Sequence, residues 1–88
     1  MKKKYLVTGG SGFIGSAIVK KLLREGHSVR VFDNNSRGNL RRLQSVIDKI
    51  EFVEGDIRDP NQVEEACKDI DAVCHLAFVN GTKFFYEL

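Results

Sequence analysis

The fold is decided at residues 8–15, TGGSGFIG, which join the short apolar run Tyr5–Val7 to a stretch with helical spacing. The glycines satisfy G-x-x-G-x-x-G through Gly9, Gly12 and Gly15, and G-x-G-x-x-G with Gly10 in place of Gly9. A chain that turns tightly off a strand needs glycine where a dinucleotide pyrophosphate must approach the backbone without a Cβ in the way. The helix that follows offers unpaired N–H groups and the positive end of its dipole to the phosphates. The stretch therefore predicts a strand, a phosphate-binding turn and a helix, with Gly15 allowing close packing of the helix on the strand.

Other glycine-rich motifs fit this stretch less well. A P-loop is excluded because no Gly-Lys-Ser/Thr follows. A kinase glycine loop is disfavoured because a helical pattern follows, and not a second strand with a V-A-I-K lysine. A plain glycine-rich turn remains as the alternative. It is disfavoured by the strand before the turn, the helix after it and an acidic residue at the expected distance.

That acidic residue is Asp33, which lies 21 positions after Gly12 and directly after a second expected strand, marked by Val29, Val31 and Phe32. A carboxylate at this place accepts hydrogen bonds from both hydroxyls of an adenosine ribose. It also repels a 2′-phosphate, which favours NAD over NADP. Arg37 argues for NADP, because an arginine just past the strand can pair with a 2′-phosphate. We expect NAD, because Asp33 is nearer to the strand end.

The rest of the chain alternates between strand and helix patterns. Helical stripes are expected at Ile14, Ala17, Ile18 and Leu22, ended by Gly26; at Leu40, Leu43, Ile47 and Ile50; and at Val63, Ala66, Cys67 and Ile70. The last helix is expected to have Asp59 as its N-cap, Pro60 at N1 and Gln62 returning the cap. Two further strands are expected at Phe52–Val53 and at residues 72–76. The alternation predicts one α/β domain over residues 1–88, with a parallel sheet flanked by helices; residues 77–88 have no assignment.

Asp56 and Ile57 follow the third expected strand. One interpretation is a solvated turn carboxylate. The other is a hydrogen bond from the adenine amino group to Asp56, with Ile57 packed on the ring. We favour the second, because both residues lie at the carboxyl end of a strand beside the expected adenosine site.

Composition and charge exclude several other classes of function. The net charge of +2 is scattered, and the run Lys2–Lys4 is expected to be a solvated terminus and not a nucleic-acid arm. No apolar stretch has the length of a membrane span, and Tyr5–Val7 is too short for a signal-peptide core, so we expect a cytoplasmic protein. Cys67 and Cys74 lack metal-site spacing and are expected to be unreactive core thiols. His75 closes the fourth strand, where we favour a structural role.

Four motifs in this order resemble the extended short-chain dehydrogenases/reductases, and within them the NAD-dependent sugar-nucleotide epimerases and dehydratases. They are residues 8–15, Asp33-Asn34 with Ser36-Arg37-Gly38, Gly55-Asp56-Ile57, and His75-Leu76-Ala77, and the resemblance covers nearly all of residues 4–80. It implies a Rossmann-type sheet of four strands in the order 3-2-1-4, the truncated half of a doubly wound fold.

The resemblance also implies a cofactor-binding residue set. Phe13 and Ile14 would lie against the pyrophosphate, and Asp56 and Ile57 at the adenine. The adenosine ribose would be surrounded by Asp33, Asn34, Asn35, Ser36, Arg37 and Gly38, and the path to the nicotinamide ribose lined by Leu76, Ala77, Phe78 and Asn80. Phe78 departs from the family, which has alanine there.

No catalytic residue is expected in this chain. The family transfers hydride with a Tyr-x-x-x-Lys pair and a Ser or Thr, whereas Tyr5 is followed four residues later by Gly9, and Tyr86 by nothing. The resemblance therefore implies an N-terminal, NAD-binding fragment that is inactive alone, with a sugar nucleotide as ligand only of a longer parent. The alternatives are a non-catalytic nucleotide-binding or interaction module, and the cofactor half of another extended short-chain reductase.

The expected truncation also predicts self-association. Residues 72–76 would form an open strand edge, because the fifth strand of the family is missing, and the aromatic residues that follow would lack cover. We expect a homodimer, formed by pairing of fourth strands or by exchange of residues 77–88. The alternative is a monomer whose tail folds back over its own edge.

Overall fold

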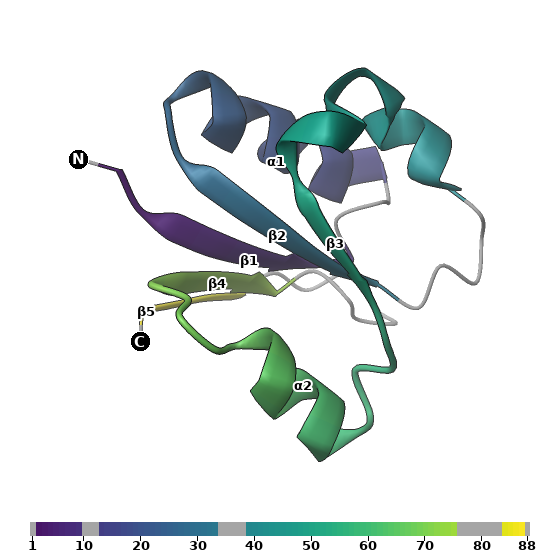
Figure 1. Ribbon diagram of the computed structural model, residues 1–88, viewed down its shortest axis with the longest axis vertical. Coiled ribbons are helices and arrows are strands. Elements are labelled where there is room, and N and C mark those ends of the chain that lie inside the picture. The colour runs from purple at the N-terminus through teal and green to yellow at the C-terminus, as the bar shows by residue number, and fades with distance from the viewer. Residues whose placement is uncertain (1, 10–12, 34–38, 76–83, 88) are drawn as a thin grey trace.

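The computed structural model describes residues 2–9, 13–33, 39–75 and 84–87 of the 88-residue chain. In chain order the elements are β1 (Lys4–Thr8), α1 (Phe13–Arg24), β2 (Ser28–Asp33), the 3₁₀ helix η1 (Asn39–Lys49), β3 (Glu51–Glu54), α2 (Pro60–Ala66), β4 (Ala72–His75) and β5 (Phe84–Glu87). Figure 1 shows them around a single sheet.

The sheet has the strand order β3-β2-β1-β4-β5, and its first four strands are parallel. This confirms the expected order 3-2-1-4. In the register, Thr8 pairs with Phe32 on one side and with His75 on the other, while Asp33 pairs with Glu54. The carboxyl ends of the four parallel strands therefore meet at one end of the sheet.

The fifth strand was not expected. Residues 84–87 pair antiparallel with β4, with Ala72 opposite Glu87 and His75 opposite Phe84. The prediction of an open edge at the fourth strand, on which a dimer through paired fourth strands depended, is therefore wrong. The chain covers this edge with its own later residues, as in the monomeric alternative.

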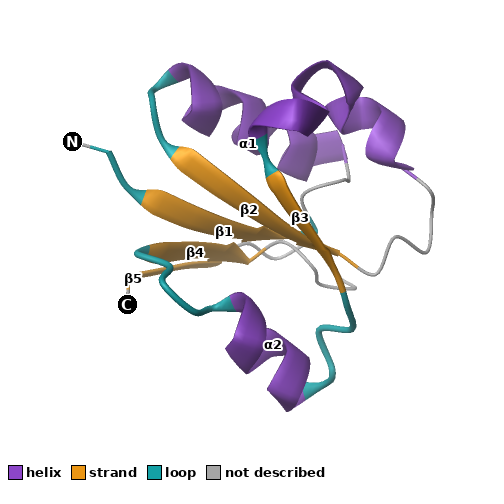
Figure 2. Ribbon diagram, in the orientation of Figure 1, coloured by secondary structure: helices purple, strands orange, loops and turns teal. Residues whose placement is uncertain are grey.

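Helices cover both faces of the sheet: α1 and η1 lie on one face and α2 on the other (Figure 2). The core accordingly has two parts. The first joins buried residues of α1 and η1 to the sheet: Val7, Val19, Leu22, Val29, Val31, Leu43 and Cys74. The second lies between the sheet and α2 with the residues that follow it, and its buried members are Leu6, Phe32, Ala66, Ile70 and Val73. Neighbouring residues of β1 and β2 point to opposite faces, so strands buried on both sides have continuous apolar runs.

The buried face of α1 differs from the expected stripe. Gly15, Ser16, Val19 and Leu22 are buried, whereas Ile14 is 48% exposed and Ala17 is exposed. Both stripes have helical spacing and share Leu22, so periodicity alone does not distinguish them. Gly15, the smallest residue of the helix, faces the sheet. This orientation buries Val19 and leaves Ile14 partly exposed.

The end of α1 confirms the role expected of Gly26. Its φ is +88°, its N–H donates to the carbonyl of Leu23, and the N–H of His27 donates to the carbonyl of Leu22, both at 3.0 Å. This pair of bonds is the Schellman motif, in which glycine occupies the left-handed position without strain.

The second helical segment is a 3₁₀ helix, where the sequence pattern suggested an ordinary helical stripe. Leu43 is fully buried, and Val46, Ile47 and Ile50 pack against the same core. Spacings of three residues occur in both kinds of helix. Of the expected stripe, Leu43 is thus buried and Ile47 and Ile50 are partly buried against the core, while the side chain of Leu40 lies outside the described residues.

The start of α2 confirms Asp59 as the N-cap and Pro60 at the first position. Asp59 accepts hydrogen bonds from the N–H groups of Asn61 and Gln62 at 2.9 and 3.4 Å. Gln62, however, does not bond the N–H of Asp59. It donates from Nε2 to the Asp59 carboxylate at 3.0 Å and accepts at Oε1 from the N–H of Asp56 at 2.7 Å.

Arg30 of β2 is a buried cation that connects three elements. Its Nε donates to Glu51 of β3 at 3.0 Å. Its NH1 donates at 2.7 Å to the carbonyl of Ala66, the last residue of α2, and at 2.8 Å to that of Lys68. Lys4 of β1 also approaches Glu51, at 3.5 Å. The pKa of Glu51 is lowered, chiefly by its hydrogen bond from Arg30.

Candidate functional site

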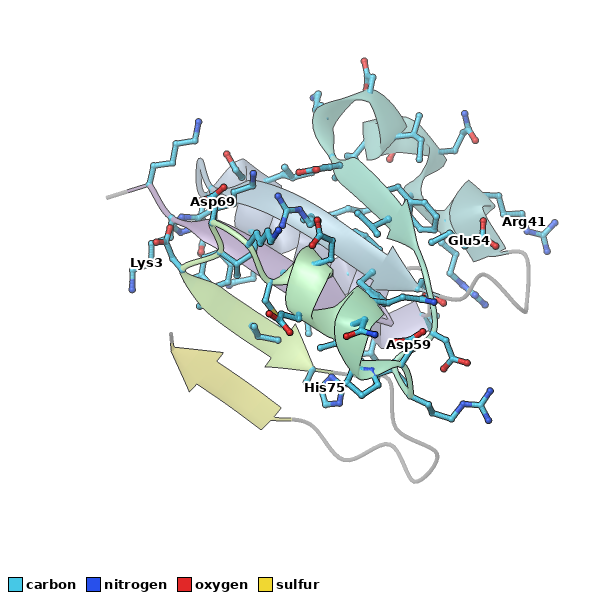
Figure 3. All side chains as sticks on the ribbon, turned by 60° about the horizontal axis from the view of Figure 1, so that its bottom comes forward. Lys3, Arg41, Glu54, Asp59, Asp69 and His75 are labelled. Atoms are coloured by element: carbon cyan, nitrogen blue, oxygen red, sulfur yellow. The ribbon has the colours of Figure 1, made fainter. Side chains whose placement is uncertain are left out.

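The candidate site lies where the four parallel strands end, which we name the carboxyl edge: Gly9 after β1, Asp33 at the end of β2, Gly55 and Asp56 after β3, and His75 at the end of β4. Figure 3 shows Glu54, Asp59 and His75 at this end of the sheet, opposite Lys3 and Asp69. From β1 the chain crosses to β2 over one face and later reaches β4 over the other. Ligands of open α/β sheets bind at the carboxyl ends beside such a reversal.

The turn after β1 begins in the conformation that the glycine motif predicts. Gly9 has a φ of +72°, and its N–H donates to the carbonyl of Phe32 at 3.0 Å. A side chain at this φ would strain the backbone. The chain therefore leaves β1 through a left-handed backbone conformation at Gly9, which glycine adopts without strain.

The first turn of α1 suits an anion. It carries no acidic residue, Gly15 is buried, and Phe13 and Ile14 are 78% and 48% exposed. The Ser16 hydroxyl donates to the carbonyl of Phe13 at 3.0 Å, so it does not compete for the N–H groups at the helix start. These N–H groups and the helix dipole favour negative charge near the carboxyl edge.

Asp33 is half-buried at the end of β2, and its carbonyl accepts from the N–H of Gly55 at 3.0 Å. This bond continues the pairing of Asp33 with Glu54 by one step beyond β3. It holds the turn that carries Asp56 against the end of the strand that carries Asp33. The two carboxylates singled out from the sequence thus come from neighbouring strand ends.

Gly55 is constrained by its neighbours and not by its φ. An added Cβ would lie 2.7 Å from Cζ of Phe32 and 2.7 Å from Oε1 of Gln62. Phe32 is 2% exposed, so its ring has no room to withdraw. Gly55 therefore allows the turn after β3 to lie directly on the Phe32 ring.

Asp56 is held by Arg58, two residues along the chain. Its Oδ1 accepts from the N–H and the Nε of Arg58 at 2.9 and 3.1 Å, and its Oδ2 accepts from NH2 at 2.9 Å. These hydrogen bonds from Arg58 lower the pKa of Asp56, and the same interaction raises the pKa of Arg58. Asp56 is therefore an ionised carboxylate of fixed orientation.

His75 is joined to the end of β1. Its Nδ1 lies 2.6 Å from the hydroxyl of Thr8, a residue that is 2% exposed. Burial lowers the pKa of the His75 imidazole, so the neutral form is favoured. The bond ties together the two central strands at the carboxyl edge, in agreement with the structural role favoured from the sequence.

Seven of the sequence-predicted site residues lie in the described ranges: Gly9, Phe13, Ile14, Gly15, Asp33, Asp56 and Ile57. The structure places them at or next to the carboxyl edge. The others lie outside the described residues: Gly12, Asn34, Asn35, Ser36, Arg37, Gly38, Leu76, Ala77, Phe78 and Asn80.

Two features of this edge were missed in the sequence. Asp56 with Arg58 two residues later is an Asx turn, and that spacing was the available signal. The Thr8–His75 bond was harder to predict. Each residue ends a strand, but only the strand order shows that these two strands are neighbours.

The described residues form neither a metal site nor a membrane-spanning helix. Among the described residues, no three His, Cys, Asp or Glu side chains gather in a way that could hold a metal ion. Nor does any helix in those ranges have the length and apolar character to cross a membrane. Cys74 is buried and Cys67 half-buried; both pack in the core and neither forms a disulfide.

The strand order, the glycine turn and the helix start together define a Rossmann-type nucleotide-binding fold. The model of the NAD dependent epimerase/dehydratase family matches residues 5–85, and the chain belongs to this family.

Individual relatives agree with this assignment. The chain is 37% identical to a UDP-N-acetyl-alpha-D-glucosaminuronate decarboxylase of Bacillus cytotoxicus over 99% of its own length, and 47% identical to a UDP-glucose 4-epimerase of Neisseria meningitidis serogroup B over 85%. It spans only 27% and 24% of these two relatives.

Solved structures show the same likeness. A dTDP-glucose 4,6-dehydratase of Bacillus anthracis in complex with NAD superposes with a TM-score of 0.80 at 32% identity, over 89% of this chain and 27% of that one. A UDP-glucose 4-epimerase of Thermus thermophilus in complex with NAD gives 0.72 at 41% identity, over 84% and 24%. The part of these enzymes that this chain matches is about a quarter of their length.

Proposed function

We propose that this chain binds NAD as the cofactor-binding part of an NAD-dependent sugar-nucleotide epimerase or dehydratase. The observation that carries the proposal is the carboxyl edge, where Gly9, Asp33 and Asp56 follow three neighbouring parallel strands beside the start of α1. The similarity to NAD complexes of a dehydratase and an epimerase supports it.

The described residues fit a dinucleotide. The start of α1, which has no acidic residue in its first turn, suits the pyrophosphate, and Gly9 leaves the backbone accessible. Asp33 offers acceptors to the adenosine ribose hydroxyls, and its negative charge disfavours a 2′-phosphate. Asp56 offers an acceptor to the adenine amino group, with Ile57 beside it for the ring.

Bound NAD would supply hydride transfer chemistry. This chain's own residues bind and orient the adenosine and pyrophosphate, and the sequence holds no Tyr-x-x-x-Lys pair. We therefore assign binding, and not turnover, to these 88 residues, and propose that recognition of a sugar nucleotide belongs to a longer parent protein. The two free thiols are consistent with a reducing compartment, and we propose the cytoplasm.

The test is a calorimetric titration of the chain with NAD and with NADP. We expect tighter binding of NAD, and an Asp33→Ala variant should lose about 1.5–3 kcal/mol of NAD binding free energy, the range for hydrogen bonds to a charged group. Asp48→Ala, which removes an exposed carboxylate of η1, is the matched control and should bind as the unmodified chain does. Equal affinity for NADP and NAD would overturn the role of Asp33, and binding of neither would overturn the proposed function.

A further inference from the structure

The turn after β3 holds Asp56 more firmly than an ordinary surface turn requires. One Asx-turn hydrogen bond, from the N–H of Arg58 to Oδ1, is enough to form the turn. Here the guanidinium of Arg58 adds two further bonds, one to each carboxylate oxygen. On the backbone side, Gln62 accepts from the N–H of Asp56 at 2.7 Å while donating to the helix cap Asp59.

Fold stability does not explain this arrangement. The side chain of Arg58 is 87% exposed and that of Asp56 is 40% exposed. Ion pairs with this much exposure contribute little to the free energy of unfolding, because water screens them and two side chains lose rotational freedom. The contacts instead fix the direction of a carboxylate that stands at the carboxyl edge.

The hydrogen bonds leave a specific acceptor open. An ionised carboxylate has about four lone-pair sites, two on each oxygen. Oδ1 of Asp56 accepts two bonds from Arg58, whereas Oδ2 accepts one. One acceptor site on Oδ2 therefore remains, on a group that has no proton to donate.

We propose that Arg58 and Gln62 are positioning residues that orient Asp56 for a purine carrying a 6-amino group and against one carrying a 6-oxo group. An amino group donates to the open site on Oδ2, whereas a 6-oxo oxygen there meets a second acceptor. This rests on the proposed function, and it adds a basis for selecting the adenine end of the cofactor.

The experiment compares binding of NAD and of nicotinamide hypoxanthine dinucleotide, which has a 6-oxo purine, by calorimetric titration of the 88-residue chain. The unmodified chain should bind NAD on the order of tenfold more tightly than the hypoxanthine compound. Arg58→Ala should weaken NAD binding several-fold but should not weaken binding of the hypoxanthine dinucleotide, because the fixed acceptor disfavours that ligand. In an Asp56→Ala background the same Arg58 substitution should have no effect on either ligand. Arg24→Ala, an exposed arginine at the end of α1, is the matched control.

A second measurement does not depend on a ligand. Titration of the Asp56 carboxyl by NMR should show its pKa rising toward the ordinary value in Arg58→Ala, with Arg58→Lys intermediate. Circular dichroism shows whether each variant is folded.

Three results would overturn the proposal: an Arg58→Ala variant that weakens both dinucleotides equally, one that binds NAD as tightly as the unmodified chain, or an undiminished Arg58 effect in the absence of Asp56. Loss of all dinucleotide binding in the unmodified chain would instead remove the proposed function, and this inference with it.

Discussion

The burial of His75 at the end of β4 makes the stability of this chain depend on pH. Burial lowers the pKa of His75 below the ordinary histidine value of 6.5. The unfolded chain then binds more protons than the folded chain in the window just below that value, so the free energy of unfolding rises with pH through the window and falls on acidification.

We predict this rise in urea titrations between about pH 5 and 8, where carboxylates with lowered pKa no longer titrate. His75→Gln should flatten the profile. Thr8→Val should lower the free energy of unfolding by about 0.5–1.5 kcal/mol, the net contribution of a hydrogen bond, but keep the slope, because burial and not the hydroxyl shifts the pKa. His27→Gln serves as the control for the other histidine of the chain. A slope that survives in His75→Gln would show that another group is responsible.

Single residues also show how far sequence patterns can predict a site. The glycine spacing and the distance to Asp33 were sufficient to predict the turn and the ribose carboxylate, because local chemistry dictates both. The reason for Gly55 was not visible, since its Cβ would meet Phe32, 23 residues earlier in the chain. Likewise, the two roles of Gln62 depend on the position of Asp56 relative to the helix start.

Arg30 connects β2 to β3 and to the end of α2, and its three bonds differ in character. The carbonyls of Ala66 and Lys68 stand at the end of a short helix, where backbone acceptors lack helical partners. Glu51 is 53% exposed, so water can replace that bond. The carbonyl bonds should therefore dominate the contribution of Arg30.

We predict that Arg30→Met lowers the free energy of unfolding by about 2–4 kcal/mol, since it removes charged hydrogen bonds and leaves buried acceptors unpaired. Glu51→Gln should cost no more than about 1 kcal/mol, as for exposed ion pairs. Urea unfolding at neutral pH measures the change in the free energy of unfolding for both variants. Equal losses in the two variants would mean that the ion pair, and not the carbonyl bonds, stabilises the junction.

The elements that were predicted well are those with caps or with several apolar residues close together: β1, β2, β4 and the capped start of α2. The predicted face of α1 was right in part, since Leu22 is buried and Ile18 packs against the core. Burial of Gly15 and Ser16 was missed, because neither has an apolar side chain to mark it. The type of η1 was wrong because a spacing of three residues occurs in both kinds of helix. In each instance tertiary packing decided between patterns that the sequence allows equally.

Across the whole molecule, β5 changes the expectation for association. It pairs with the outer edge of β4, which the strand order 3-2-1-4 alone would leave open. No local pattern indicated β5. This strand begins about ten residues after its partner β4 ends, and it runs in the opposite direction to the other strands.

We predict that the full chain is monomeric in sedimentation equilibrium at micromolar concentration, with the amides of residues 72–75 protected from hydrogen exchange. A variant ending at residue 83 should lose part of this protection and self-associate, because an unpaired strand edge is a template for pairing. A chain ending at Glu87 is the control. A dimeric full chain, or a monomeric truncated one with unchanged protection, would contradict the assigned role of β5.

The central claim is that a dinucleotide binds at the carboxyl edge, and NMR titration of the isotope-labelled chain with NAD tests it most directly. Amide signals of Gly9, Ile14, Asp33 and Asp56 should shift together and saturate with one dissociation constant. Signals at the opposite end of the sheet, such as those of Lys4, His27 and Asp71, should not move. Shifts centred on that opposite end, or no saturable shifts at the carboxyl edge, would contradict the account.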